Sequence, residues 1–146
     1  MSVNLSGNSI SRVWREGDII FKRQPKYLAD NEEYALVILS HTYHWTMVPR
    51  FISRVDDETI AMAYIENEPV TDALLFMRYF DEVLRMIDSA GLRHGDLTEY
   101  TVMVNNNMPI IIDWAESRWR SDPRPDKRPG GDDVWLKATM EKLCQH

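Results

Sequence analysis

A chain of 146 residues with 44% hydrophobic and 27% charged residues has the composition of one compact globular unit. The net charge of -6 argues against general affinity for nucleic-acid backbones, and no apolar run approaches the length of a transmembrane helix, so we expect neither nucleic acid nor membrane as a partner. The single cysteine, Cys144, excludes an internal disulfide, and the polar N-terminus is not that of a signal peptide, so a cytoplasmic protein is expected.

The first part of the chain contains short runs of branched and aromatic residues separated by polar turns, a pattern typical of antiparallel strands. We expect four such strands, over residues 11–15, 19–23, 51–55 and 59–65. The turn Glu16-Gly17-Asp18 is of the kind that joins two strands in a hairpin. Between the two pairs, Asp30 and Glu33 have the spacing of a capping box, which predicts a helix that starts at Asp30 and continues through Tyr34–Leu39.

The second part is predicted to be mainly helical. Apolar residues recur at helical spacing from Phe76 to Ile87, with Thr71 or Asp72 as the N-cap and Gly91 as the C-terminal signal. A small hairpin and a last helix follow, over residues 101–104, 109–112 and 133–143. Segregated strands and helices predict an α+β fold in two lobes, residues 1–66 and 67–146, within a single domain.

Two acidic residues follow apolar or helical segments on either side of the small hairpin. Asp96 belongs to His94-Gly95-Asp96-Leu97, and Asp113 ends the apolar run Ile110–Ile112. Phosphoryl transfer uses two acids in different roles: one orients the acceptor hydroxyl and one holds the magnesium ion that bridges the nucleotide phosphates. A hairpin between the two residues predicts that both lie at one edge of a cleft.

The strings HGDL and IIIDW resemble the catalytic loop and metal-binding strand of the protein-kinase-like superfamily, which includes the aminoglycoside phosphotransferases, the RIO-type kinases and the kinase subunit of the KEOPS complex. The resemblance implies a reduced bilobal kinase-like fold, with an N-terminal antiparallel sheet and one helix, and a small, mainly helical C-terminal lobe. It implies ATP and Mg²⁺ as cofactors, with Asp96 as the catalytic acid, Asp113 as the principal metal ligand and His94 as a brace for the loop.

The N-terminal part is similar to the start of the same superfamily. The phosphate-covering loop would consist of small or polar residues, Ser6, Gly7, Asn8 and Ser9, whose backbone N–H groups can approach phosphate oxygens. Lys22 lies on an apolar strand, where a charged side chain needs a reason, and the resemblance implies that it pairs with the α- and β-phosphates. The alternative is a lysine that only extends its head to water.

The superfamily also uses a helical glutamate to hold this lysine. Glu32 and Glu33 compete for that role, and Glu32 is favoured because it shares a helix face with Leu36 and Leu39. The linker between the lobes is expected to meet adenine through its backbone, at Ala63, Tyr64, Ile65 and Glu66. Near the C-terminus, Asp133 resembles the aspartate that supports the catalytic loop, with Asp132 as the alternative.

Two departures from the superfamily pattern leave two hypotheses open. Thr101 stands where the pattern has an asparagine, which makes it the candidate second metal ligand but a poorer one than an amide carbonyl. The relatives carry a large helical subdomain beyond the position of His146. The chain is therefore an ATP- and Mg²⁺-dependent phosphotransferase acting on a protein Ser or Thr hydroxyl, or a pseudokinase that binds nucleotide or serves as a scaffold without catalysis.

The last predicted helix carries Leu136, Met140 and Leu143 at positions that share one face. In larger relatives further helices cover this face, so the sequence predicts an exposed apolar patch here. Such patches usually mark contacts with other proteins. We therefore expect a protein partner or substrate, with a homo-oligomer as a further possibility.

Overall fold

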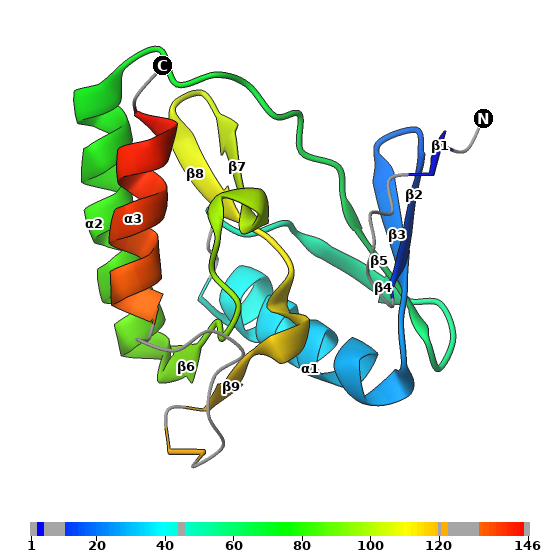
Figure 1. The fold of residues 1–146 in the computed structure, drawn as a ribbon. Helices are drawn as coiled ribbons and strands as arrows, with labels where there is room; N and C mark the ends of the chain where they lie inside the picture. Colours follow the sequence, from blue (N-terminus) through cyan, green and yellow to red (C-terminus); the bar gives the residue numbers. More distant parts are fainter. Residues whose placement is uncertain (1–2, 5–10, 44–45, 120, 123–131, 145–146) are drawn as a thin grey trace.

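The computed structural model describes residues 3–4, 11–43, 46–119, 121–122 and 132–144. Strands come first, then a helix, two more strands, a long helix, a small hairpin and a last helix (Figure 1). This order confirms the predicted α+β class. No helix in the described ranges is long and apolar enough to cross a membrane.

The N-terminal half forms a five-stranded antiparallel sheet in the order β1-β2-β3-β5-β4. Its strands are β1 (Val3–Asn4), β2 (Arg12–Glu16), β3 (Ile19–Arg23), β4 (Phe51–Arg54) and β5 (Thr59–Ala63). The hairpin between β2 and β3 turns at Gly17, whose φ of 60° is one that glycine adopts without strain. β3 lies in the middle of the sheet, where Lys22 is paired with Val13 on one side and Ile60 on the other.

Helix α1 (Lys26–Leu36) packs against the sheet and continues as a π-helical segment, η1 (Val37–Thr42). The predicted start at Asp30 was wrong, because the helix begins four residues earlier, after Pro25 at the N-cap. Asp30 and Glu33 form no capping box: both carboxylates bind Arg54, at 3.0 and 3.2 Å. The spacing of a capping box also occurs inside helices, and proline at a helix start presets the required backbone angle.

Helix α2 (Ala73–Ala90) starts and ends as the local sequence predicts. Asp72 caps it by accepting a hydrogen bond from the Leu75 N–H, whereas Thr71 instead contacts Asn107 in the small hairpin. Gly91 ends the helix with a φ of 72°. Its buried face consists of apolar residues at helical spacing: Phe76, Phe80, Val83, Ile87 and Ala90.

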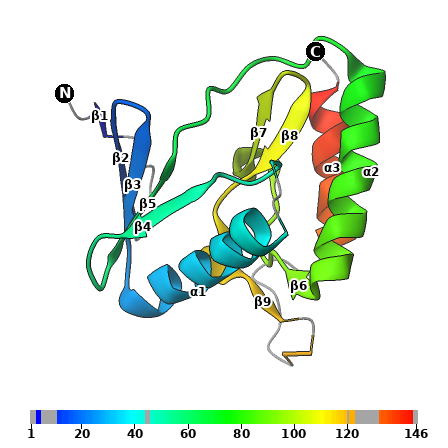
Figure 2. The same cartoon turned by 180° about the vertical axis from the view of Figure 1, so that it is seen from behind.

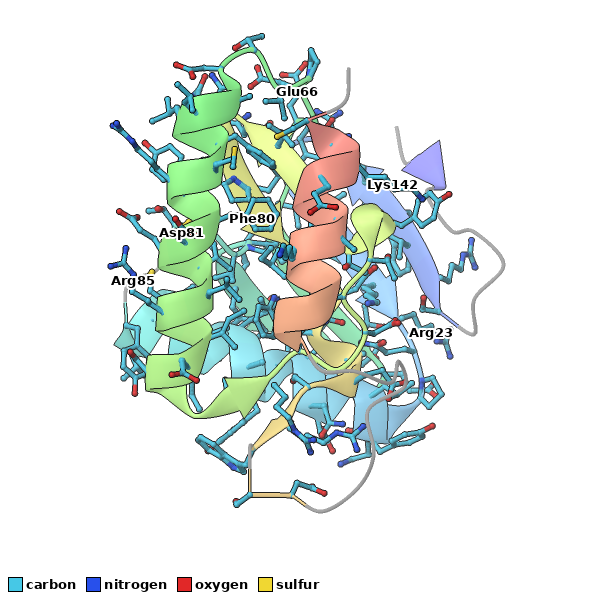
Figure 3. The ribbon with its side chains drawn as sticks, turned by 60° about the vertical axis from the view of Figure 1, so that its left-hand side comes forward. Arg23, Glu66, Phe80, Asp81, Arg85 and Lys142 are labelled. Atoms are coloured by element: carbon cyan, nitrogen blue, oxygen red, sulfur yellow. The ribbon has the colours of Figure 1, made fainter. Side chains whose placement is uncertain are left out.

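Figure 3 shows this amphipathic arrangement, with Phe80 pointing into the molecule while Asp81 and Arg85 point away from it. Helix α3 (Asp132–Leu143) lies beside α2 in both Figure 1 and Figure 2. Leu143 is half-buried and packs against the core, so the predicted exposed patch was wrong at this residue. The side chains of Leu136 and Met140 lie outside the described part of the chain.

The remaining elements are short and surround the predicted catalytic residues. They are β6 (Leu92–Arg93), η2 (Glu99–Thr101), β7 (Val102–Asn105), β8 (Met108–Ile111), η3 (Trp114–Glu116) and β9 (Arg118–Trp119). β7 and β8 form the small hairpin, and β6 pairs with β9. One buried apolar cluster runs from α1 through β5 and α2 to Trp114, and the division at residue 66 stays a prediction.

Candidate active site

A cleft of about 320 Å³ lies between the N-terminal sheet and the β7–β8 hairpin. Its described lining is mainly apolar, with a few polar groups, as in small-molecule sites. The lining residues are Ser11, Val13, Ile20, Lys22, Pro49, Met62, Ala63, Tyr64, Ile65, Tyr100, Met103, Ile112 and Asp113. Two predicted site residues, Lys22 and Asp113, therefore meet in one cleft although 91 positions separate them.

Lys22 lies between two carboxylates, one buried and one half-exposed. Its Nζ is 2.8 Å from Glu32 Oε1 and 3.1 Å from Asp113 Oδ1. The side chains of Lys22 and Glu32 are 7% and 1% exposed, whereas that of Asp113 is 44% exposed. Burial alone would lower the pKa of Lys22, but the negative charges of Glu32 and Asp113 outweigh burial and hold the pKa above its ordinary value. The lysine is therefore a fixed positive charge at neutral pH.

Glu32 is held by three donors, which explains how a carboxylate can lie in the core. Besides Lys22, Gln24 Nε2 donates to its Oε1 at 2.9 Å, and the backbone N–H of Trp114 donates to its Oε2 at 3.1 Å. Glu33 pairs with Arg54 instead. Glu32, and not Glu33, therefore lies beside the lysine. This agrees with the expectation from the helix face that Glu32 shares with Leu36 and Leu39.

Asp113 sits at the start of η3 in a left-handed backbone conformation, with φ and ψ both at 61°. Non-glycine residues adopt this conformation rarely, and only where the surrounding structure holds them in it. Among the described residues, Lys22 is the one side chain that pairs with its carboxylate. Protein sites for Mg²⁺ use one or two carboxylates together with substrate phosphates, and a half-exposed aspartate at a cleft edge fits that requirement.

No group of three or more metal-binding side chains exists in the described ranges. A magnesium site here would accordingly be completed by the ligands of the nucleotide rather than preformed by the protein.

The predicted catalytic loop is braced by His94, which is fully buried. The backbone N–H of Asp96 donates to its Nδ1 at 3.1 Å, so Nδ1 carries no proton. The protonated nitrogen is then Nε2, which donates to the carbonyl of Ile112 at 2.7 Å. The ring also packs edge-on against Trp114, with centroids 4.7 Å apart. His94 thereby connects the loop that carries Asp96 to the strand end that carries Asp113.

A second bond fixes the other end of this loop, since the N–H of Ile112 donates to the carbonyl of Thr101 at 2.8 Å. Thr101 is 5% exposed, and its hydroxyl accepts from the Thr98 N–H at 2.9 Å and donates to the Thr98 carbonyl at 3.0 Å. This hydroxyl closes a capping box at η2. With its proton donated and one lone pair in use, this buried hydroxyl keeps one lone pair for its predicted contact with metal.

The sequence analysis gave no separate role to Gly95, which lies between His94 and Asp96 in the loop. Its φ is 87°, and a Cβ at this position would lie 2.6 Å from the carbonyl oxygen of Glu116. The loop therefore approaches the segment after Asp113 so closely that only glycine fits. Asp96 follows directly, half-buried, and is not among the residues that line the described cleft.

The linker residues lie at the other end of the cleft from Lys22. The N–H of Tyr64 donates to the Asp18 carbonyl at 2.9 Å, so this N–H is not available to a nucleobase. The Glu66 carbonyl accepts from Asn105 Nδ2 at 3.2 Å. Ile65 lines the cleft, and within the described structure its backbone N–H has no protein acceptor. This N–H is thus one linker donor that remains for a base.

Several predicted residues cannot be placed. Ser6, Gly7, Asn8 and Ser9 lie outside the described residues, as do the side chains of Asp132 and Asp133. Conversely, sequence reasoning missed Gln24 and Trp114 as partners of Glu32. Gln24 could have been noticed as a polar residue directly after the strand that carries Lys22. No local pattern predicts a backbone donor such as the Trp114 N–H, which comes from another part of the chain.

Comparison with known proteins agrees with this geometry. The sequence matches the RIO domain family (RIO1) over residues 22–127, well over half of the chain. No curated protein matches it in a sequence search. Its fold is similar to that of the Rio2 kinase from Chaetomium thermophilum, solved as an ADP/Mg²⁺–phosphoaspartate complex, with a TM-score of 0.63 and 16% identity over 99% of this chain and 61% of that one.

Two further structures share the fold. The Cydia pomonella granulovirus kinase PK-1 has a TM-score of 0.67 and 12% identity over 97% of this chain and 70% of that chain. WbdD, in a co-crystal with the kinase inhibitor LY294002, has a TM-score of 0.59 and 15% identity over 95% of this chain. The chain spans only 44% of WbdD and 61% of Rio2. It has the protein-kinase-like fold, with Lys22, Glu32 and Asp113 at one cleft, and it belongs to the RIO domain family.

Proposed function

We propose that the protein is an ATP- and Mg²⁺-dependent phosphotransferase whose acceptor is a hydroxyl of another protein. The observation that carries the proposal is the position of Lys22, a buried cation fixed by Glu32 and facing the half-exposed Asp113 across the cleft. A lysine with a raised pKa at the edge of an apolar pocket supplies a permanent positive charge for phosphate oxygens. The RIO domain match and the ADP and Mg²⁺ of the Rio2 complex support the same reading.

Each residue has a separable task in this proposal. The N–H of Ile65 would bind the base, Lys22 would bind the phosphates, and Asp113, now paired with Lys22, would hold the metal ion. Mg²⁺ neutralises charge on the transferred phosphoryl group when it is bound. Asp96 accepts the proton of the acceptor hydroxyl, from a loop whose shape His94 maintains. We further propose a cytoplasmic location and a protein as the substrate.

A pseudokinase is the second candidate, because the Thr101 hydroxyl is used inside the loop. The two candidates differ in turnover and not in nucleotide binding. A thermal shift with ATP, with and without Mg²⁺, tests binding, and transfer of radiolabelled phosphate to protein tests catalysis. We expect a magnesium-dependent rise in the melting temperature. The absence of any shift would contradict the phosphotransferase and a nucleotide-binding pseudokinase, and would leave only a scaffold.

Asp96→Asn separates the two candidates. It should retain ATP binding and lose transfer by at least a hundredfold, the contribution typical of a general base. Asp81→Asn is the matched control, since Asp81 points away from the core on α2 (Figure 3) and should change neither property. Labelled protein is also treated with hydroxylamine, which releases phosphate from an aspartyl phosphate such as the one in the Rio2 complex, but not from a Ser or Thr ester. Equal transfer by wild type and Asp96→Asn would refute the catalytic role.

A further inference from the structure

The hairpin of β2 and β3 holds the linker through two contacts with one residue, Tyr64, and a third contact inside the hairpin supports them. The guanidinium of Arg15 lies 3.5 Å from the centre of the Tyr64 ring. Arg15 Nε also donates to the carbonyl of Gly17 at 2.7 Å, which fixes the guanidinium over that ring. The carbonyl of Asp18, the next residue in the turn, accepts the Tyr64 N–H at 2.9 Å. Tyr64 is thus held by its ring and by its backbone at once.

The direction of Arg15 follows from the alternation of side chains along β2. Ser11 and Val13 line the cleft, so Arg15 belongs to the same face of the sheet. Arg12 and Trp14 lie on the opposite face, where the Arg12 guanidinium sits 5.7 Å from the Trp14 ring. The strand therefore carries two arginines over aromatic rings, one on the cleft side and one on the side away from it.

The position of the clamped residue matters because of its neighbour. Ile65 lies between two anchors: Tyr64, held by the turn, and Glu66, whose carbonyl accepts from Asn105 of β7. On the far side, Glu68 is tied to β7 as well, through its N–H and the Val104 carbonyl at 2.7 Å. The N–H of Ile65, which has no acceptor among the described residues, is therefore held by the β2–β3 hairpin on one side and by β7 on the other, although it belongs to no helix or strand.

We infer that Arg15 is a positioning residue for nucleobase recognition, because it clamps Tyr64 and thereby holds the Ile65 N–H where it can donate to a purine. The inference rests on the proposed function, since it concerns the base end of the same cleft. A fixed N–H donor distinguishes purines by chemistry. Adenine N1 accepts a hydrogen bond, whereas guanine N1 carries a proton and faces the donor with another donor.

Loosening the clamp should weaken the binding of ATP and reduce its preference over GTP together. A partly exposed cation–π contact is worth about 0.5–2 kcal/mol, which corresponds to a change of roughly twofold to thirtyfold in an equilibrium. Only part of this change should appear in the affinity for the nucleotide, because Arg15 acts on it through Tyr64. We therefore expect Arg15→Gln to raise the dissociation constant for ATP about threefold to tenfold and that for GTP less than twofold.

The experiment is calorimetric titration of the full chain with ATP and with GTP at fixed Mg²⁺. The variants are Arg15→Gln, Arg15→Lys and the control Arg12→Gln, which removes a cation from an aromatic ring on the other face of the same strand. Arg15→Lys keeps the charge but loses the planar group and the bond to Gly17, so it should fall between wild type and Arg15→Gln. Arg12→Gln should keep the wild-type ratio of ATP to GTP affinity.

The ratio separates positioning from mere loss of stability. A general loss of stability would weaken ATP and GTP equally, and melting temperatures without nucleotide measure that loss for each variant. Tyr64→Leu and the double variant complete a cycle in which the two changes should not add. If wild type binds ATP but Arg15→Gln keeps its ATP-to-GTP ratio, the inference is overturned while the proposed function stands. If wild type fails to bind ATP, the proposed function is overturned first and the inference falls with it.

Discussion

The two walls of the cleft hold charge in opposite ways. On the sheet side, the side chains of Lys22 and Glu32 are 7% and 1% exposed, and three donors bind the glutamate. On the hairpin side, Asp113 is 44% exposed and sits in a left-handed conformation, with one side-chain partner in the described structure. Charges buried with full partners are rigid but cannot be removed without a large loss of stability, whereas exposed ones can exchange partners. The buried pair on the sheet side is therefore held in place, whereas Asp113 on the hairpin side can exchange its partner.

The largest effect should come from removing the buried acid. Glu32→Ala leaves Lys22 buried without its main partner, and the free energy of unfolding should fall by about 3–5 kcal/mol. Glu33→Ala is the matched control on the same helix, where the lost contact is a partly exposed pair with Arg54, so the loss should stay under about 1 kcal/mol. Urea denaturation followed by circular dichroism measures both. Similar losses for the two variants would contradict the contrast between a buried and a surface acid.

The backbone of the catalytic loop comes next. Gly95→Ala places a Cβ 2.6 Å from the Glu116 carbonyl, and it also forces alanine to a φ of 87°. Gly17→Ala imposes a similar backbone strain, at a φ of 60°, with nothing within 4 Å of the new Cβ. The strain alone should lower the stability of each by about 1–2 kcal/mol. Gly95→Ala should lose more than Gly17→Ala in the same denaturation experiment. Equal losses would mean that the loop shifts away from Glu116 freely.

A smaller effect on stability is expected at the exposed wall. Asp113→Asn removes a charge that Lys22 does not need in order to stay paired, since Glu32 remains at 2.8 Å. The free energy of unfolding should change by less than about 1 kcal/mol. The dependence of ATP binding on Mg²⁺ should nevertheless disappear, because a neutral amide is a poor ligand for this ion. Magnesium titrations of the ATP thermal shift, compared with wild type, check both parts, and an unchanged magnesium midpoint would exclude Asp113 as the ligand.

The smallest effect concerns alkaline pH. A lysine whose pKa is raised by folding contributes stability that is complete below the unfolded value, about 10.4, and is lost only as pH rises through the folded value. The Lys22 pair should therefore leave the urea denaturation midpoint unchanged between about pH 6 and about pH 9. A midpoint that falls steadily over this range would show that Lys22 loses its proton at moderate pH.

Acid acts with the opposite sign. Hydrogen bonds from Lys26 and then Arg54 hold the pKa of Asp30 below its ordinary value. A carboxylate of this kind contributes stability above its ordinary pKa, and the contribution is lost as pH falls through the lowered value. The side chain of Asp30 is 48% exposed, so the loss should be slight. The comparison of Asp30→Asn with wild type at pH 7 and pH 3 measures it, and a difference that grows at pH 3 would contradict the sign.

Local patterns in the sequence by themselves determined most of the elements and the fold class. The β2–β3 hairpin, the amphipathic α2 with its cap at Asp72 and end at Gly91, and the α+β class all follow from periodicity and turn residues. The strings around Asp96 and Asp113 indicated the kinase-like superfamily, which the RIO domain match confirms. The start of α1 was wrong for a local reason too, because a helix interior and a capping box can share one spacing.

Only the tertiary structure decided which of these residues meet. Lys22 contacts Asp113 across 91 positions, and Glu32 receives the Trp114 N–H across 82, contacts that exist because α1 packs between the sheet and η3. The need for glycine at position 95 comes from the Glu116 carbonyl, and the clamp on Tyr64 comes from a turn 46 positions earlier in the chain, at Asp18. Periodicity reports which face a residue occupies, but partners depend on how faces pack, and that is a property of the whole fold.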